Sequence, residues 1–100
     1  MIDWTRIVGF DWDQGNRRKS VDKHSVSEAE AEQVFFNDPL VVTDDLKHSL
    51  AEARYQGLGR TIANRLLHVT FTLRDHATKI RIISARDMNR KEKSRYGQET

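Results

Sequence analysis

Cysteine is absent from this sequence of 100 residues. Its absence excludes disulfide bonds and thiolate metal sites, and it fits a reducing compartment. Long hydrophobic runs are also missing, since no stretch approaches the ~20 apolar residues that a membrane-spanning helix needs. The first residues show no signal-peptide pattern. We therefore expect a cytoplasmic protein without a membrane segment.

The common nucleotide-binding and hydrolase motifs are missing too. The sequence contains no G-x-x-x-x-G-K-[ST] phosphate loop, no G-x-G-x-x-G fingerprint and no nucleophile elbow. Its histidines show no H-x-x-x-H or similar spacing, so we expect neither a metal site nor a cofactor. The four are His24, His48, His68 and His76.

The length suits one compact domain, which we expect to span residues 1–100. Hydrophobic residues make up 37% of the chain and charged residues 32%. Although this composition is polar, the apolar residues fall in periodic runs, which predicts a folded domain rather than a disordered one.

Charge is unevenly distributed along the chain. Residues 25–52 contain seven acidic side chains against one lysine, whereas residues 53–75 carry a net charge of +3 and residues 76–100 a net charge of +4. A basic half attracts anions and favours phosphate backbones. The distribution indicates a polyanion-binding surface, although an ordinary solvated basic end would give the same pattern.

Three elements are expected in the first half: a strand, a weak basic helix and a stronger helix, at residues 7–12, 14–24 and 27–37. Ser27 and Glu30 have capping-box spacing, which predicts the start of the stronger helix. Pro39 predicts its end, because the residue before a proline disfavours helical backbone.

Four further strands and a helix are expected in the second half. The strands are predicted at residues 40–42, 54–59, 65–74 and 79–86. Asn89 and Glu92 repeat the capping-box spacing and predict a C-terminal helix. Strands at hairpin spacing predict an α+β fold, with an antiparallel sheet and its helices on one face.

Alternation in the two longest strands predicts one buried and one open face. Leu67, Val69, Phe71 and Leu73 share one face of the first, and His68, Thr70, Thr72 and Arg74 share the other. In the next strand, strict alternation places Arg86 on the face of Ile80, opposite Arg81. The two arginines would share a site only if the strand contained a bulge. The aromatic residues expected in the core are Trp12, Phe35, Phe36 and Phe71.

The open face suits the chemistry of RNA cleavage without a metal ion. Such cleavage needs a base for the 2′-hydroxyl, an acid for the leaving 5′-oxygen, and cations for the phosphoryl charge. Arginine fits the last role because it stays charged. Glu92 could be the base, and Tyr96 or a histidine the acid. The alternative is that Glu92 and Tyr96 simply share the surface of a helix, beside a solvated sheet face.

Six stretches in this order resemble the BrnT family, the toxins of BrnT–BrnA type II toxin–antitoxin modules. They are FDWDQGNRRKSVDKHSVS, EAEQVFFNDPL, DDLKHS, RYQGLGRT, RLLHVTFTLR and IRIISARDMNRKEKSRY. The resemblance implies a RelE-like fold and a bacterial ribonuclease that halts translation. It also implies a BrnA-type antitoxin partner, whose DNA-binding part lets the hetero-oligomer repress its own operon.

Three residues depart from the pattern that the resemblance implies. Asn is common at the position of Ser20, and Gly at the positions of Ser25 and Asn64. Two alternatives to a ribonuclease stay open: a non-catalytic RelE-like module that binds RNA or a partner, and a DNA-binding repressor.

The resemblance and the open face together give the candidate site. The expected catalytic residues are Arg81, Arg86, Glu92 and Tyr96, and the expected RNA-binding residues are Trp12, Lys23, His24, His48, Arg65 and Arg74.

Overall fold

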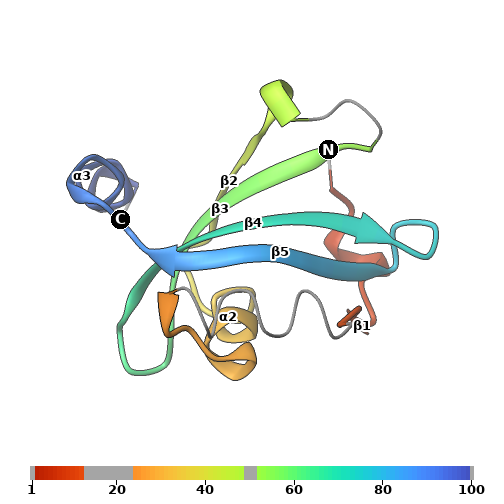
Figure 1. Ribbon diagram of the computed structural model, residues 1–100, viewed down its shortest axis with the longest axis horizontal. Helices are drawn as coiled ribbons and strands as arrows, with labels where there is room; N and C mark the ends of the chain where they lie inside the picture. The colour runs from red at the N-terminus through yellow and green to blue at the C-terminus, as the bar shows by residue number, and fades with distance from the viewer. Residues whose placement is uncertain (1, 13–23, 49–51, 100) are drawn as a thin grey trace.

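The computed structural model describes residues 2–12, 24–48 and 52–99, and its fold is α+β, as predicted (Figure 1). Most of the helix expected at residues 14–24 lies outside the described residues. The elements in chain order are η1 (Trp4–Arg6), β1 (Gly9–Phe10), α2 (Glu28–Gln33), β2 (Val41–Asp44), η2 (Leu46–His48), β3 (Arg54–Arg60), β4 (Leu66–Arg74), β5 (Lys79–Asp87) and α3 (Arg90–Gln98).

The strands form one mixed sheet in the order β1-β5-β4-β3-β2. Strands β2 to β5 are antiparallel neighbours, which confirms the four strands expected in the second half. The first strand differs from the prediction: β1 is two residues long and lies parallel to β5, with Gly9 beside Lys79 and Phe10 beside Ile80. The sheet is therefore mixed, with its parallel pair at one edge.

Helix α2 covers one face of the sheet (Figure 1). Its predicted capping box is present, since the Ser27 side chain accepts from the Glu30 amide and the Glu30 side chain accepts from the Ser27 amide. The helix ends before the predicted residue 37, because the amides of Phe35 and Phe36 form three-residue turns. The core under α2 comprises Val26, Ala31, Val34, Leu67, Val69, Phe71, Ile80, Ile82 and Ala85.

Helix α3 lies at the end of the sheet away from the β4–β5 turn (Figure 1), and not on the face that α2 covers. Its Tyr96 forms a second buried cluster with Leu58 and Met88. Leu58 pairs with His68, so this cluster lies on the face opposite the main core. The expectation that the helices share one face is therefore wrong. The capping box at Asn89 is confirmed.

The expected aromatic core is correct except at Phe36. Phe71 is fully buried, and Phe35 and Trp12 pack partly against the core. Phe36, which follows the end of α2, is 77% exposed, and its ring lies 6.1 Å from the ring of Phe10. It lines an apolar groove of about 1140 Å³ together with Trp4, Phe10 and other residues.

Two of the departures from the family pattern occupy left-handed backbone. Ser25 has φ of 56° and Asn64 has φ of 65°. Glycine adopts this region without strain, which fits the glycine expected at both positions. None of the helices within residues 2–12, 24–48 and 52–99 has the length and hydrophobicity of a membrane span.

Candidate active site

A bulge in β5 determines which side chains share the open face. Phe71 of β4 pairs with Ile82, but Thr70, the residue before it, pairs with Ser84. Ile83 is therefore an extra residue on β5, and the alternation of side chains reverses after it. As a result, Arg86 lies on the same face as Arg81. Strict alternation would have placed the two arginines on opposite faces.

The open face is a strip of polar residues across three strands, and two of its β4 side chains, His68 and Thr72, are buried within it. Their pairing places Arg81 opposite Thr72, Ser84 opposite Thr70, and Arg86 opposite His68. Residues directly opposite on antiparallel strands have Cβ atoms ~5 Å apart. The strip contains Arg54 and Gln56 from β3, His68, Thr70, Thr72 and Arg74 from β4, and Lys79, Arg81, Ser84 and Arg86 from β5.

Arg86 and Glu92 form the ionic centre of this face. The two terminal nitrogens of Arg86 donate to Oε1 and Oε2 of Glu92 at 2.8 and 2.9 Å. The capping box of α3 fixes the carboxylate, because Glu92 also accepts from the Asn89 amide. The hydrogen bond from Arg86 lowers the pKa of Glu92, and the same bond raises the pKa of Arg86. Both groups are therefore charged at neutral pH.

His68 lies beside this ion pair. Its side chain is almost fully buried, and its Nε2 lies 3.8 Å from Oε2 of Glu92. Burial lowers the pKa of His68, and the charge of Arg86 lowers it further. The ring is therefore neutral at neutral pH and can accept a proton. The sequence alternation placed His68 on this face, but His68 was not among the expected site residues.

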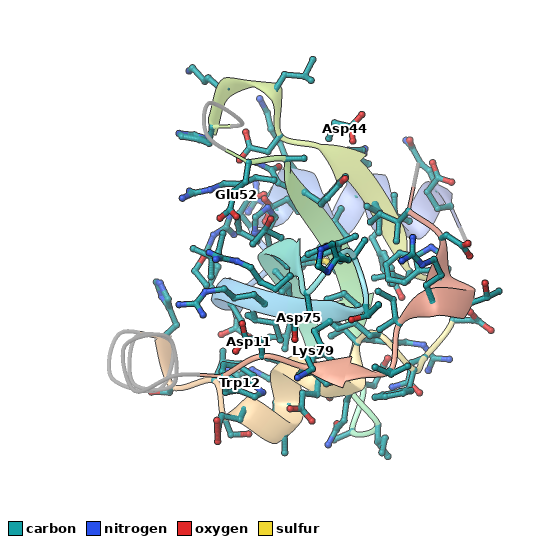
Figure 2. All side chains as sticks on the ribbon, turned by 90° about the vertical axis from the view of Figure 1, so that its right-hand side faces the viewer. Asp11, Trp12, Asp44, Glu52, Asp75 and Lys79 are labelled. Atoms are coloured by element: carbon teal, nitrogen blue, oxygen red, sulfur yellow. The ribbon has the colours of Figure 1, made fainter. Side chains whose placement is uncertain are left out.

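Three of the other cations of the open face have acidic neighbours. Arg74 contacts Glu52 at 3.0 Å, and Arg81 lies 3.6 Å from Asp11. Lys79 pairs with Asp75 at 3.3 Å. Figure 2 views the molecule from this end, with Asp75 and Lys79 near the centre and Glu52 to one side. Arg74 and Lys79 are exposed, so their ion pairs are weak and screened by salt, and a phosphate can compete for these two cations.

Asp45 and His48 form a second pair near the open face. Nδ1 of His48 lies 3.1 Å from Oδ1 and 3.0 Å from Oδ2 of Asp45. Asp45 is only 7% exposed, whereas the His48 side chain is 61% exposed. Burial raises the pKa of Asp45, but hydrogen bonds from His48 and Gln56 outweigh it, and the net pKa lies below its ordinary value. The pair combines a buried carboxylate with an accessible imidazole.

The Tyr96 hydroxyl forms its hydrogen bond away from Arg81 and Arg86. It donates to the carbonyl of Pro39 at 2.6 Å, and the residue is 4% exposed. Burial raises the pKa of this phenol. In this structure the side chain anchors α3 to the segment before β2.

Arg65 lies away from the open face, beside α2. Its guanidinium donates to both carboxylate oxygens of Asp87, to Glu30 and to the carbonyl of Ser25. The hydrogen bond to Asp87 raises the pKa of Arg65, and the bond to Glu30 adds to it. These contacts tie the start of β4 to the end of β5 and to α2.

Trp12 and His24 also lie on the α2 side of the sheet. The indole Nε1 of Trp12 donates to Glu32 at 2.6 Å, and the carbonyl of His24 accepts from Arg65 at 3.5 Å. Lys23, the remaining expected RNA-binding residue, lies outside the described residues. Within the described part of the chain, no three His, Asp or Glu side chains gather as a metal site would require.

The open face therefore combines arginine cations, a buried neutral histidine and a fixed carboxylate. A family model described as the ribonuclease toxin BrnT of type II toxin–antitoxin systems matches residues 12–92. The chain belongs to the BrnT family. Membership in this family of ribonuclease toxins implies an antitoxin partner. No curated protein matches the chain significantly.

Proposed function

We propose that this BrnT chain is a metal-independent endoribonuclease that cleaves RNA and inhibits translation. The observation that supports this proposal is the position of Arg81, Arg86 and His68 on one open sheet face, beside the carboxylate of Glu92. We take residues 1–100 as a single toxin domain, and its mixed sheet as a variant of the RelE-like fold.

The arginines would bind the scissile phosphate and stabilise its transition state. In cleavage by transesterification, the 2′-oxygen attacks phosphorus and negative charge increases on the phosphoryl oxygens. A guanidinium stays protonated and offers a planar set of donors to those oxygens. Arg86 would contact the phosphate from beside Glu92, and Arg81 would add a second positive charge on the same face. Arg74 would bind the RNA backbone further along the strip.

His68 is the best-placed base for the 2′-hydroxyl. Its burial keeps the imidazole neutral, and its Nε2 lies 3.8 Å from the Glu92 carboxylate, which would stabilise the imidazolium formed on proton uptake. The low pKa of Glu92 makes that carboxylate a weak base. We therefore assign Glu92 the task of orienting Arg86 and stabilising charged His68.

The other expected site residues receive different roles in this proposal. Tyr96 would act by anchoring α3, which carries Glu92. Arg65, Trp12 and His24 would stabilise the packing of α2 against the sheet. A direct contact between these three residues and RNA on the open face would require the RNA to pass around the sheet edge.

The partner that the family implies would be a BrnA-type antitoxin. We propose that it forms a hetero-oligomer with this chain in the bacterial cytoplasm and covers Arg81 and Arg86. Operator DNA would be bound only through the antitoxin part of that complex. A complex that leaves both arginines open to solvent would contradict neutralisation by occlusion.

The ribonuclease proposal is tested by expressing the chain alone and following growth and total RNA. The wild type should arrest growth, and the purified protein should cut total RNA with EDTA present. Arg86→Ala should do neither. Arg95→Ala, which removes an exposed arginine of α3, is the matched control and should behave as wild type. If the wild type and Arg86→Ala both bind RNA and neither cuts it, the chain is a non-catalytic binding module.

A further inference from the structure

We propose that His48, held by Asp45, is the general acid that protonates the leaving 5′-oxygen during RNA cleavage. The proposal rests on the ribonuclease function proposed above. It adds a second proton-transfer group to the open face, and it assigns Asp45 as the positioning residue of that group.

The geometry of the pair fits this role. Both carboxylate oxygens of Asp45 lie about one hydrogen-bond length from Nδ1 of His48, at 3.0 and 3.1 Å. A proton on Nδ1 can therefore donate to the carboxylate, and Nε2, across the ring, remains for a substrate. With 61% of its side chain exposed, His48 is accessible to a ligand as large as RNA. A carboxylate that binds one imidazole nitrogen sets the tautomer and the orientation of the ring, and so determines where the other nitrogen points.

Asp45 is itself rigidly placed. Its amide donates to the carbonyl of Arg54 at 2.9 Å, which continues the β2–β3 pairing by one residue. Its side chain accepts a hydrogen bond from Gln56, which belongs to the open face. A carboxylate that is 7% exposed and bonded from both β3 and η2 has little freedom to move. It can therefore hold His48 in one orientation.

The pair borders the same face as the proposed base. Alternation along β2 places Val41 and Thr43 on the open face, opposite Leu58 and Gln56, and Asp45 is next in that series. The charge of Asp45 also acts on His68. The register places Asp45 in the row of Arg54, Thr72 and Arg81, four β4 residues from His68 toward the β4–β5 turn. RNA bound along the face could contact both histidines.

The chemistry requires a group of this kind. The bond from the 2′-oxygen to phosphorus forms, and the bond from phosphorus to the 5′-oxygen breaks. The 2′-hydroxyl proton passes to His68, and the proton of the His48 imidazolium passes to the 5′-oxygen. The products are a 2′,3′-cyclic phosphate and a 5′-hydroxyl. Arginine does not give up its proton at neutral pH, and Glu92 is held ionised by Arg86, so neither can act as the acid.

A substrate that needs no acid tests the proposal. In an RNA dinucleotide with sulfur in place of the bridging 5′-oxygen, the leaving thiolate departs without protonation. On the ordinary dinucleotide, His48→Gln should lower the single-turnover rate by ~10²-fold or more. On the sulfur substrate, its rate should lie within about threefold of wild type. Asp45→Asn should show a smaller loss and the same rescue, which a merely structural role would not produce.

Two control variants separate this role from others. Arg86→Ala should stay slow on both substrates, because it removes phosphate stabilisation. His76→Gln, in the exposed β4–β5 turn, should match wild type on both. If His48→Gln is equally slow on both substrates, or as fast as wild type on the ordinary one, the general-acid role is wrong. If wild type cleaves neither substrate, the ribonuclease proposal itself fails and this role fails with it.

Discussion

His68 and Arg86 lie directly opposite each other on β4 and β5. This pairing places a buried neutral imidazole beside a guanidinium that Glu92 holds with two hydrogen bonds. It depends on one extra residue, Ile83, which reverses the alternation of β5. Without the bulge, Ala85 would oppose His68 and Arg86 would point toward the α2 core.

The bulge can be tested by cross-linking, since the sequence has no cysteine of its own. A variant with Thr70→Cys and Ser84→Cys should form a disulfide on mild oxidation, because directly paired residues satisfy the Cα spacing of ~4.4–6.8 Å that a disulfide needs. A variant with Thr70→Cys and Ile83→Cys should cross-link more slowly, since the bulge pairs Thr70 with Ser84 and not with Ile83. Mass spectrometry measures both. The reverse order of rates would show an unbulged register.

The acid dependence of stability should report on the Arg86–Glu92 pair. The folded pKa of Glu92 lies below its ordinary value of 4.5, so its stabilising effect is present above pH 4.5 and is lost as the pH falls through the lower folded value. Glu92→Gln should therefore unfold at lower denaturant than wild type at pH 7, and the difference should shrink as the pH drops below about 4.5. Urea denaturation at pH 7 and pH 3.5 measures this. A difference that is equal at both pH values would contradict the ion pair.

Arg65 should contribute to stability rather than to catalysis. Arg65→Gln removes the contacts to Asp87, Glu30 and the Ser25 carbonyl, and should lower the free energy of unfolding by roughly 2 kcal/mol. The cleavage rate, measured well below the melting temperature, should stay within about threefold of wild type. Arg95→Gln, at an exposed site, is the matched control and should change stability by less than ~0.5 kcal/mol. A stable Arg65→Gln variant that no longer cleaves RNA would instead make Arg65 a site residue.

Replacing Ser25 with glycine, the residue expected there from the family resemblance, should stabilise the fold. Its φ of 56° costs a side-chain-bearing residue about 1 kcal/mol, part of which glycine recovers. We expect Ser25→Gly to raise Tm by about 3 °C. Ser94→Gly, inside α3, should lower stability by ~0.5–1 kcal/mol. If Ser25→Gly also lowers Tm, the left-handed backbone is not a source of strain.

Local patterns predicted the parts of the fold that depend on neighbours in sequence. The capping boxes at Ser27 and Asn89 fixed the starts of both described helices, and alternation identified the buried face of β4. The parallel pairing of β1 and the position of α3 depend on contacts between distant segments. Phe36 illustrates the difference, because a hydrophobic residue just past a helix end can face either the core or solvent.

The candidate site was also predictable only in part, because it combines local sequence patterns with contacts between distant segments. Arg81, Arg86 and Glu92 are site residues predicted from the sequence, but placing both arginines on one face required a bulge that alternation alone could not locate. His68 and Asp45 became significant only through their neighbours across strands. Arg65 and Tyr96 resembled site residues in the sequence. The structure shows Arg65 bonded to carboxylate groups away from the open face, and the Tyr96 hydroxyl bonded to the backbone carbonyl of Pro39.

We propose that RNA binds the face that carries Arg81 and Arg86. NMR of the arginine side-chain Nε–H groups tests this during titration with a dinucleotide whose 2′-hydroxyl is methylated and cannot attack. The signals of Arg81 and Arg86 should shift together and saturate, while that of Arg65 should not respond. A titration in which Arg65 and the Trp12 indole shift, and Arg81 and Arg86 stay unchanged, would contradict it.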